Sequence, residues 1–190
     1  MTLDTKKNTF VKLGKFLGQF KEGNCIKNEA VFDNDLFFEK FIDLIQLSQS
    51  HNGWYTPEQV FFSIQSWAEA LTDENLDKWL STYDLSKVEQ KKVALILAGN
   101  IPLVGFHDFL SVLIAGHDVL VKTSSNDQHL LPFLANYLIA SEPEFENKIE
   151  ICKKNLKAHK ESYSFKLELN EEELKKAFIM ANQTKTEISE

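Results

Sequence analysis

A lysine and two hydroxyl-bearing residues follow a short apolar run near the middle of the chain. After Val-Leu-Val come Lys122, Thr123 and Ser124. Lysine supplies positive charge and the hydroxyl groups supply hydrogen-bond donors, so together they suit a ribose and its phosphate. The pattern is weakly specific, because a lysine at such a position is usually surface decoration and the chain contains neither GxGxxG nor GxxxxGK[ST].

A second polar turn, Ala98 to Leu103, follows the preceding apolar run. Gly99 permits a tight turn there, and Pro102 suits the first turn of a helix predicted over residues 101–115. The side-chain amide of Asn100 either faces a ligand at this turn or only caps that helix. The residue pattern leaves both interpretations open.

The cysteines and histidines form no recognisable metal-binding or nucleophilic pattern. Cys25 and Cys152 are the only cysteines, too far apart for a disulfide framework or a zinc site. His107 and His117 lack HExxH or three-ligand spacing, so no metal is predicted, and no GxSxG elbow supports a Ser-His-Asp arrangement. His107 lies in a mostly apolar helix and is expected to be a hydrogen-bonded core residue.

A parallel α/β unit would bring the two polar turns together. Strands are predicted over residues 93–97, 118–122 and 148–152, with helices over 101–115 and 128–140. Ligands bind at the carboxyl ends of strands in open parallel sheets, which is where both turns would lie. The continuous apolar run 93–97 predicts a buried strand with helices on both faces.

The first 85 residues are predicted to be a helical arm without strands. Apolar residues recur at helical spacing over residues 5–19 and 36–47, with Asp33 as a candidate N-cap of the second helix. Thr56-Pro57-Glu58 and Thr72-Asp73-Glu74 begin two more helices. A partial nucleotide-binding α/β unit is predicted from 86 to 182, including a strand at 165–169 and a helix at 171–181, then a frayed tail at 183–190.

Composition and charge exclude several classes of protein. The 43% apolar content indicates a globular chain, and the net charge of −7 argues against nucleic-acid binding. The polar N-terminus does not resemble a signal peptide, and the most apolar stretch contains too many polar residues for a membrane span. With only two cysteines, the sequence predicts a protein of the reducing cytoplasm.

Residues 92–127, KVALILAGNIPLVGFHDFLSVLIAGHDVLVKTSSND, resemble a segment of the aldehyde dehydrogenase superfamily. That segment is a strand, a turn similar to Pro-Trp-Asn-Phe-Pro, a helix, a glycine, and a strand ending in Lys-Pro-Ser. The corresponding residues here are Asn100, Pro102, Gly116, Lys122 and Ser124. Residues 10–156 as a whole, including WYTPEQVFFSIQSWAEAL and ENLDKWLS, resemble bacterial acyl-CoA reductases of the bioluminescence type, particularly those of Bacteroidetes.

The resemblance implies the N-terminal part of a fatty acyl thioester reductase with a helical N-terminal arm and a partial Rossmann-like parallel sheet. In this family a cysteine takes the acyl group from CoA, and NADPH delivers hydride to give an aldehyde. The resemblance implies that Asn100 donates to the thiohemiacetal oxyanion. It also implies that Lys122, Thr123 and Ser124 hold the adenosine ribose of NADP or its 2′-phosphate.

The chain departs from the family pattern after residue 156. The family continues with a strand, an Ala-Thr-Gly-Ser-like phosphate turn and the cysteine nucleophile, where this chain reads KAHKESYSFKLELNEEELKKAF. Cys152 is expected to be a core thiol of a buried strand. We therefore expect a truncated or rearranged reductase that acts on acyl-CoA or an acyl thioester with a partner chain supplying the catalytic domain.

Two alternatives remain open from the sequence. The chain could bind a nucleotide without carrying out redox chemistry. It could also be a non-catalytic interaction module on a degenerate nucleotide-binding scaffold, with the Phe-rich helical arm binding a protein partner.

Overall fold

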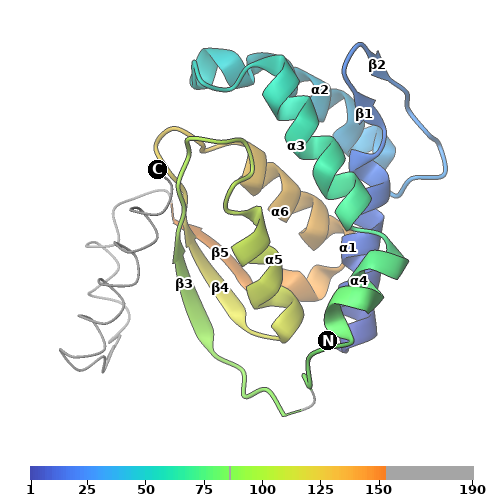
Figure 1. Cartoon of the computed structure of the whole chain (residues 1–190), viewed down its shortest axis with the longest axis vertical. Helices are drawn as coiled ribbons and strands as arrows, with labels where there is room; N and C mark the ends of the chain where they lie inside the picture. Colours follow the sequence, from blue (N-terminus) through green and yellow to red (C-terminus); the bar gives the residue numbers. More distant parts are fainter. Residues whose placement is uncertain (86, 153–190) are drawn as a thin grey trace, which may run out of the picture. The chain divides into compact units, whose positions relative to one another are not determined.

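The computed structural model describes residues 1–85 and 87–152, and it confirms the predicted α/β class with a helical N-terminal region. Met1–Lys154 form one compact unit. The strand, helix and tail predicted beyond residue 152 lie outside the described residues. The helices are α1 (Leu3–Leu17), α2 (Asn34–His51), α3 (Pro57–Ala70), α4 (Asp73–Leu80), α5 (Phe106–Ala115) and α6 (Leu130–Ser141), with a 3-10 turn at Pro143–Phe145 (Figure 1).

Three parallel strands form the sheet, in the order β3 (Lys92–Ile96), β4 (Asp118–Lys122) and β5 (Ile149–Cys152). Ile96 pairs with Lys122, and Lys122 pairs with Cys152, so the three strands end at one edge. Helices α5 and α6 are the crossovers that parallel strands need.

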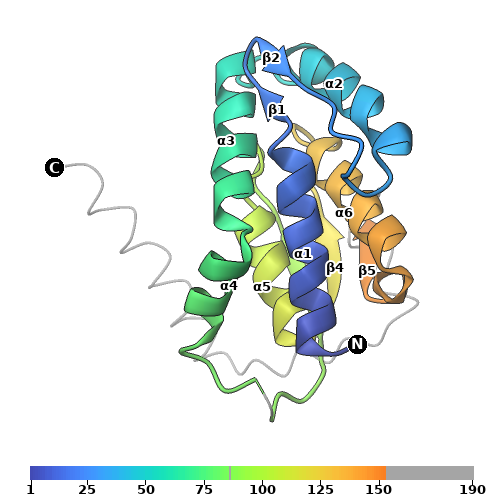
Figure 2. The same cartoon turned by 90° about the vertical axis from the view of Figure 1, so that its right-hand side faces the viewer.

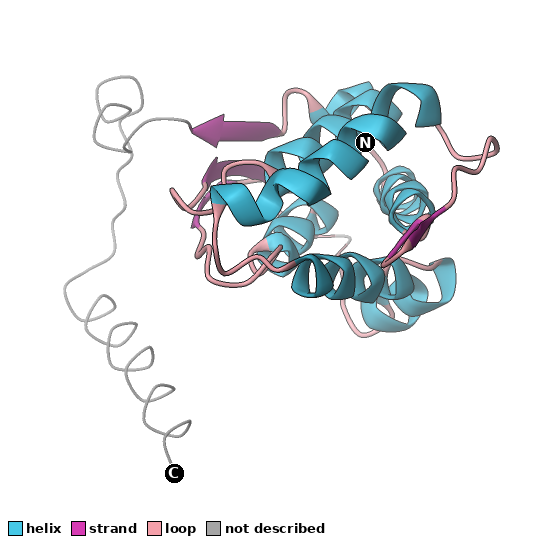
Figure 3. Ribbon diagram, turned by 90° about the horizontal axis from the view of Figure 1, so that it is seen from above, coloured by secondary structure: helices cyan, strands magenta, loops and turns pink. Residues whose placement is uncertain are grey.

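The helices of the described residues lie on one side of this sheet (Figures 1 and 3). The prediction that residues 93–97 are covered on both faces is therefore wrong for the part of the chain that the structure describes. Side chains alternate between the two faces of a strand, and Leu95 packs against the helical core whereas Ile96 is 76% exposed.

Helix α1 is the centre of the helical layer and lies between α3 and α6 (Figure 2). An aromatic cluster joins it to α2 and α6. The fully buried Phe16 ring lies 4.5 Å from the Tyr137 ring centroid and is surrounded by four further aromatic rings, those of Phe20, Phe37, Phe41 and Phe133. Several of the phenylalanines of the N-terminal region therefore build the core.

The helix starts match the sequence signals in two of three places. Thr56 and Thr72 are N-caps whose side chains accept hydrogen bonds from Gln59 N and Asn75 N, as predicted. Asp33 also lies at an N-cap, but its backbone is left-handed at φ 47° and its side chain makes no capping bond. The prediction that Asp33 caps α2 is wrong in this respect.

A short antiparallel pair, β1 (Phe20–Lys21) and β2 (Asn24–Cys25), lies between α1 and α2. The sequence predicted no strand in this region. Two residues per strand are too few to show the alternation of apolar and polar side chains that identifies a strand.

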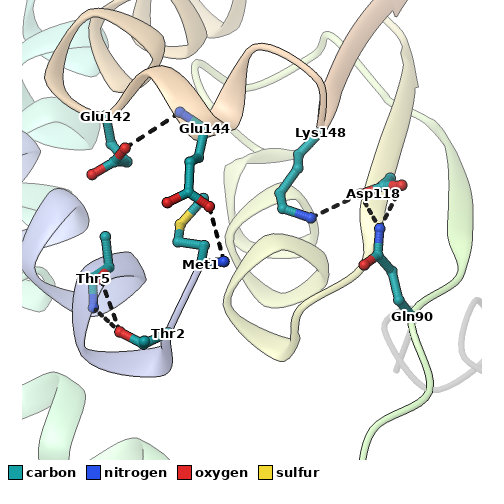
Figure 4. A network of polar contacts seen from close by, with 8 residues as sticks. All are labelled: Met1, Thr2, Thr5, Gln90, Asp118, Glu142, Glu144 and Lys148. Atoms are coloured by element: carbon teal, nitrogen blue, oxygen red, sulfur yellow. Dashed lines mark hydrogen bonds and ion pairs between the residues drawn. The ribbon is translucent and has the colours of Figure 1, made fainter.

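The amino-terminal edge of the sheet carries a set of structural polar contacts (Figure 4). The Asp118 carboxylate accepts hydrogen bonds from Gln90 Nε2 at 2.9 Å and from Lys148 Nζ at 3.3 Å. The amino group of Met1 pairs with Glu144 at 2.9 Å. The Asp118 contacts join the start of β4 to the residues just before β3 and β5, at the edge opposite the two predicted polar turns. None of the described helices is long and apolar enough to cross a membrane.

A buried lysine from α1 stabilises the end of α5. Lys6 Nζ donates to the Ile114 carbonyl at 2.7 Å, where a positive charge favours the helix C-terminus. The pKa of Lys6 is lowered, mainly by burial and also by the charge of Lys148. We expect Lys6→Met to lower the free energy of unfolding by about 1–3 kcal/mol, because it leaves a buried carbonyl without its donor.

Urea denaturation monitored by circular dichroism measures this loss. Lys15→Met is the matched control, since Lys15 is an exposed lysine of the same helix. A Lys6→Met chain as stable as the control would contradict the role given to the buried amine.

Candidate nucleotide-binding edge

The structure brings the two predicted polar turns together at the carboxyl edge of the sheet. One follows β3 and the other follows β4, and they touch at Gly99 and Ser124. A Cβ atom on Gly99 would lie only 2.6 Å from both Cβ and Oγ of Ser124 and 3.2 Å from Asp127 N. Glycine at position 99 therefore lets the two turns approach more closely than any other residue would.

Asn100 lies in this contact region with an exposed side chain. Helix α5 begins at Phe106 rather than at Ile101, so the predicted helix over 101–115 starts five residues too early. The reason is Leu103, which is buried and has a left-handed backbone at φ 58°, incompatible with a continuing helix. Gly105 occupies the N-cap of α5, so the interpretation of Asn100 as its N-cap is wrong.

The three predicted ribose-binding residues differ in their accessibility. Lys122, the last residue of β4, is partly exposed, and its Nζ donates to the Thr123 carbonyl at 2.8 Å. Ser124 is also partly exposed, and its Oγ accepts from Asn126 N at 3.2 Å. Thr123 is only 8% exposed and lines a cavity of about 10 Å³ together with Asp127. Lys122 and Ser124 thus present side-chain polar atoms at the edge, whereas the Thr123 side chain is turned inward.

A buried carboxyl group lies beneath these residues, and the sequence analysis did not identify it. Burial raises the pKa of Asp127, and hydrogen bonds from Tyr55 and from the backbone of Leu130 and His129 partly oppose the shift. The pKa of Tyr55 is also raised, mainly by burial and further by the charge of Asp127 and the hydrogen bond to it. Tyr55 therefore stays a hydrogen-bond donor. The position of Asp127 before a predicted helix was a usable N-cap signal, whereas nothing in the sequence pointed to Tyr55.

Because the pKa of Asp127 is raised, the free energy of unfolding is expected to depend on pH. A carboxyl whose pKa is higher in the folded state takes up its proton before the unfolded chain does. The free energy of unfolding of the wild type is therefore expected to increase relative to Asp127→Asn as the pH falls from about 7 towards the ordinary Asp pKa of about 3.9. Urea denaturation of both chains across this range tests it. A wild-type stability that decreases or stays constant relative to that of Asp127→Asn as the pH falls would contradict the raised pKa of Asp127.

Neither cysteine is arranged as an activated nucleophile. Cys152 is buried at the end of β5, and its burial and Glu150 raise its thiol pKa more than Lys122 and Lys92 lower it. The pKa of the partly exposed Cys25 is also raised, mainly by burial. Protonated thiols are poor nucleophiles, and this agrees with the expectation that Cys152 is a buried, inert thiol.

His107 is an exposed residue, contrary to the prediction of a core histidine. Its side chain is 64% exposed and its ring centroid lies 6.0 Å from that of Trp79. The preceding residue, Phe106, occupies the core position of this turn of α5, which leaves His107 on the outer face. No group of three potential metal-ligating side chains occurs within residues 1–85 and 87–152.

Comparison with known proteins gives a match to a family and a match to a single relative. The sequence model of the family acyl-CoA reductase (LuxC) matches residues 68–179. A long-chain acyl-protein thioester reductase of Aliivibrio fischeri is 40% identical over 68 residues, which are 35% of this chain and 13% of that protein. The match therefore spans a small part of the relative's length. No solved structure matches the chain.

The family match covers more than half of the chain and includes α4, β3, α5, β4, α6 and β5. Asn100, Lys122 and Ser124, which belong to the two turns at the carboxyl edge of the sheet, all lie within it. The chain therefore belongs to the acyl-CoA reductase (LuxC) family.

Proposed function

We propose that this chain provides the cofactor-binding edge of an NADPH-dependent acyl thioester reductase. The observation that carries the proposal is the contact between the turn with Asn100 and the turn with Lys122 and Ser124 at the carboxyl ends of β3 and β4. In the proposed site Lys122 and Ser124 hold the adenosine ribose and its 2′-phosphate, with Thr123 supporting them from below. The exposed Asn100 amide donates to the oxygen of the acyl carbonyl as negative charge develops on it.

The residues at this edge fit the adenosine part of NADPH. Lys122 provides a cation and Ser124 a hydroxyl, and Gly99 lets the turn of Asn100 lie directly against Ser124. The carboxyl group of Asp127 interacts with the backbone of His129 and Leu130 at the start of α6, and Lys122 is the cation that this edge offers to the phosphate. NADPH would supply the hydride.

The nucleophilic thiol of the reaction must come from another polypeptide segment. The 190 residues contain only Cys25 and Cys152, and the pKa of each thiol is raised. We propose that a partner segment carrying a reactive cysteine acts with this edge on a fatty acyl thioester. The Aliivibrio fischeri relative is a long-chain acyl-protein thioester reductase, which supports a long-chain acyl group bound as a thioester.

Direct binding of NADPH to the 190-residue chain tests this proposal. Calorimetric titration is expected to show saturable binding, weakened about 10-fold or more in Lys122→Ala because a hydrogen bond to a charged group is lost. NADH, which has no 2′-phosphate, is expected to bind more weakly and to respond less to Lys122→Ala. Lys91→Ala is the matched control, since Lys91 is an exposed lysine just before β3 and thus at the opposite edge.

Two results would refute the assignment. The first is no saturable binding at millimolar NADPH, and the second is equal affinity in Lys122→Ala and wild type. The alternative of a protein-binding module gains limited support from the Phe-rich N-terminal region, because Phe10, Phe16, Phe20, Phe38 and Phe41 are buried within the unit and only Phe32 and Phe62 among its described phenylalanines are exposed.

A further inference from the structure

The junction between α2 and α3 holds the backbone on both sides of Asn100. Asn52 Nδ2 donates to the Gly99 carbonyl at 3.0 Å, and the Tyr55 hydroxyl donates to the Ile101 carbonyl at 3.2 Å. The donors are buried, with Asn52 6% and Tyr55 2% exposed. These two carbonyls belong to the residues immediately before and after Asn100, so its backbone is fixed while its side chain remains exposed.

The same junction also reaches the turn that follows β4. The Tyr55 hydroxyl also interacts with the buried carboxyl group of Asp127, three residues after Ser124, so its one proton is shared between that carboxyl group and the Ile101 carbonyl. The imidazole of His51 stacks on that of His129, with 4.1 Å between ring centroids and an angle of 29°. The end of α2 and the beginning of α6 are thereby in contact above the sheet edge.

The junction is itself a compact turn. Tyr55 N donates to the Asn52 carbonyl at 2.8 Å, and Trp54 N donates to Asn52 Oδ1 at 3.0 Å. The Asn52 side chain therefore uses its oxygen to close the turn and its nitrogen to bind Gly99. Such Asx turns hold a short backbone segment in one conformation, so the donors of this turn are preorganised.

We propose that Asn52 and Tyr55 are positioning residues, which align Asn100 with the turn of Lys122 and Ser124. In this arrangement the helical N-terminal region is part of the site, because it sets the relation between the two turns. The inference rests on the proposed function in taking Asn100 as the donor to the acyl oxygen and Lys122 with Ser124 as the adenosine-binding residues.

Amide hydrogen exchange of the full chain, followed by NMR, tests the positioning without any cofactor. Tyr55→Phe removes the hydroxyl and keeps the buried ring, and it is expected to accelerate exchange at Val104 and Phe106, whose amides donate to carbonyls of this turn, by about 2- to 10-fold, the equivalent of one hydrogen bond. Tyr83→Phe is the control, because Tyr83 is exposed. Asn52→Ser is expected to have the same local effect as Tyr55→Phe. Exchange in this turn that matches the Tyr83→Phe control in both variants would overturn the inference.

Cofactor binding separates positioning from general destabilisation. Adenosine 2′,5′-bisphosphate contains the adenosine half of NADPH and engages only the turn of Lys122 and Ser124, whereas NADPH also extends towards the turn of Asn100. Asn52→Ser loses the bond to the Gly99 carbonyl and keeps the Tyr55 hydroxyl beside Asp127, so it is expected to weaken NADPH binding by about 2- to 10-fold and to leave the bisphosphate unaffected.

Equal weakening of both ligands, or of neither, would overturn the positioning role. A wild-type chain that binds neither ligand would instead refute the proposed cofactor site. In that case the exchange rates still decide whether Asn52 and Tyr55 hold the Asn100 turn.

Discussion

Gly99→Ala is expected to disrupt the contact between the two turns and to weaken NADPH binding by at least about 10-fold, because small displacements in a preorganised site are costly. The new Cβ would lie 2.6 Å from both Cβ and Oγ of Ser124, and 3.2 Å from the backbone nitrogen of Asp127. Side-chain rotation cannot remove a clash with a Cβ atom, so one backbone segment must move.

Movement of the Gly99 backbone would also disturb the hydrogen bond from Asn52 to its carbonyl. We therefore expect a loss of about 1–3 kcal/mol in the free energy of unfolding in addition to the loss of affinity. Calorimetric titration with NADPH and urea denaturation of the same variant measure the two effects.

Gly53→Ala is the control for this prediction. Gly53 lies in the α2–α3 junction, where a Cβ would meet no atom within 4 Å, so its replacement is expected to change neither property appreciably. Wild-type affinity and stability in Gly99→Ala would mean that the turns tolerate separation. The close approach of the turns would then have no role in binding.

The sequence was sufficient to predict the parallel strands and the meeting of the two turns. Apolar runs closed by Gly99 and by Lys122 identified β3 and β4, and parallel strands necessarily end at the same edge. Short-range signals also sufficed for the N-caps Thr56 and Thr72, because the capping residue and its bonded amide are three positions apart.

The parts that the sequence could not predict depend on contacts between distant residues. Asn52 and Gly99 are 47 positions apart, and Tyr55 and Ile101 are 46 apart, so no local pattern connects them. The late start of α5 depends on the left-handed backbone of the buried Leu103, since leucine has no local preference for that conformation. His107 was misplaced because an apolar helix sequence does not show which face a neighbouring helix covers.

The helical region is predicted to depend on Phe16 more than on any single surface residue. Its side chain is fully buried, and its ring lies between 4.5 and 6.4 Å from the centroids of five aromatic rings of β1, α2 and α6. Phe16→Ala is expected to lower the free energy of unfolding by about 3–5 kcal/mol, because it removes buried apolar surface and leaves a cavity that neighbouring rings cannot fill. Phe16→Leu, which keeps more of the volume, is expected to cost less.

Phe62→Ala on α3 is the matched control. Phe62 is 75% exposed, so the same substitution there is expected to change stability by no more than about 0.5 kcal/mol. Urea denaturation followed by circular dichroism measures both variants. Since α1 packs against α3, α5 and α6, loss of the Phe16 cluster would loosen the helices that cover the sheet as well as the N-terminal region. Similar stability of Phe16→Ala and Phe62→Ala would show that the aromatic cluster does not hold the helices on the sheet.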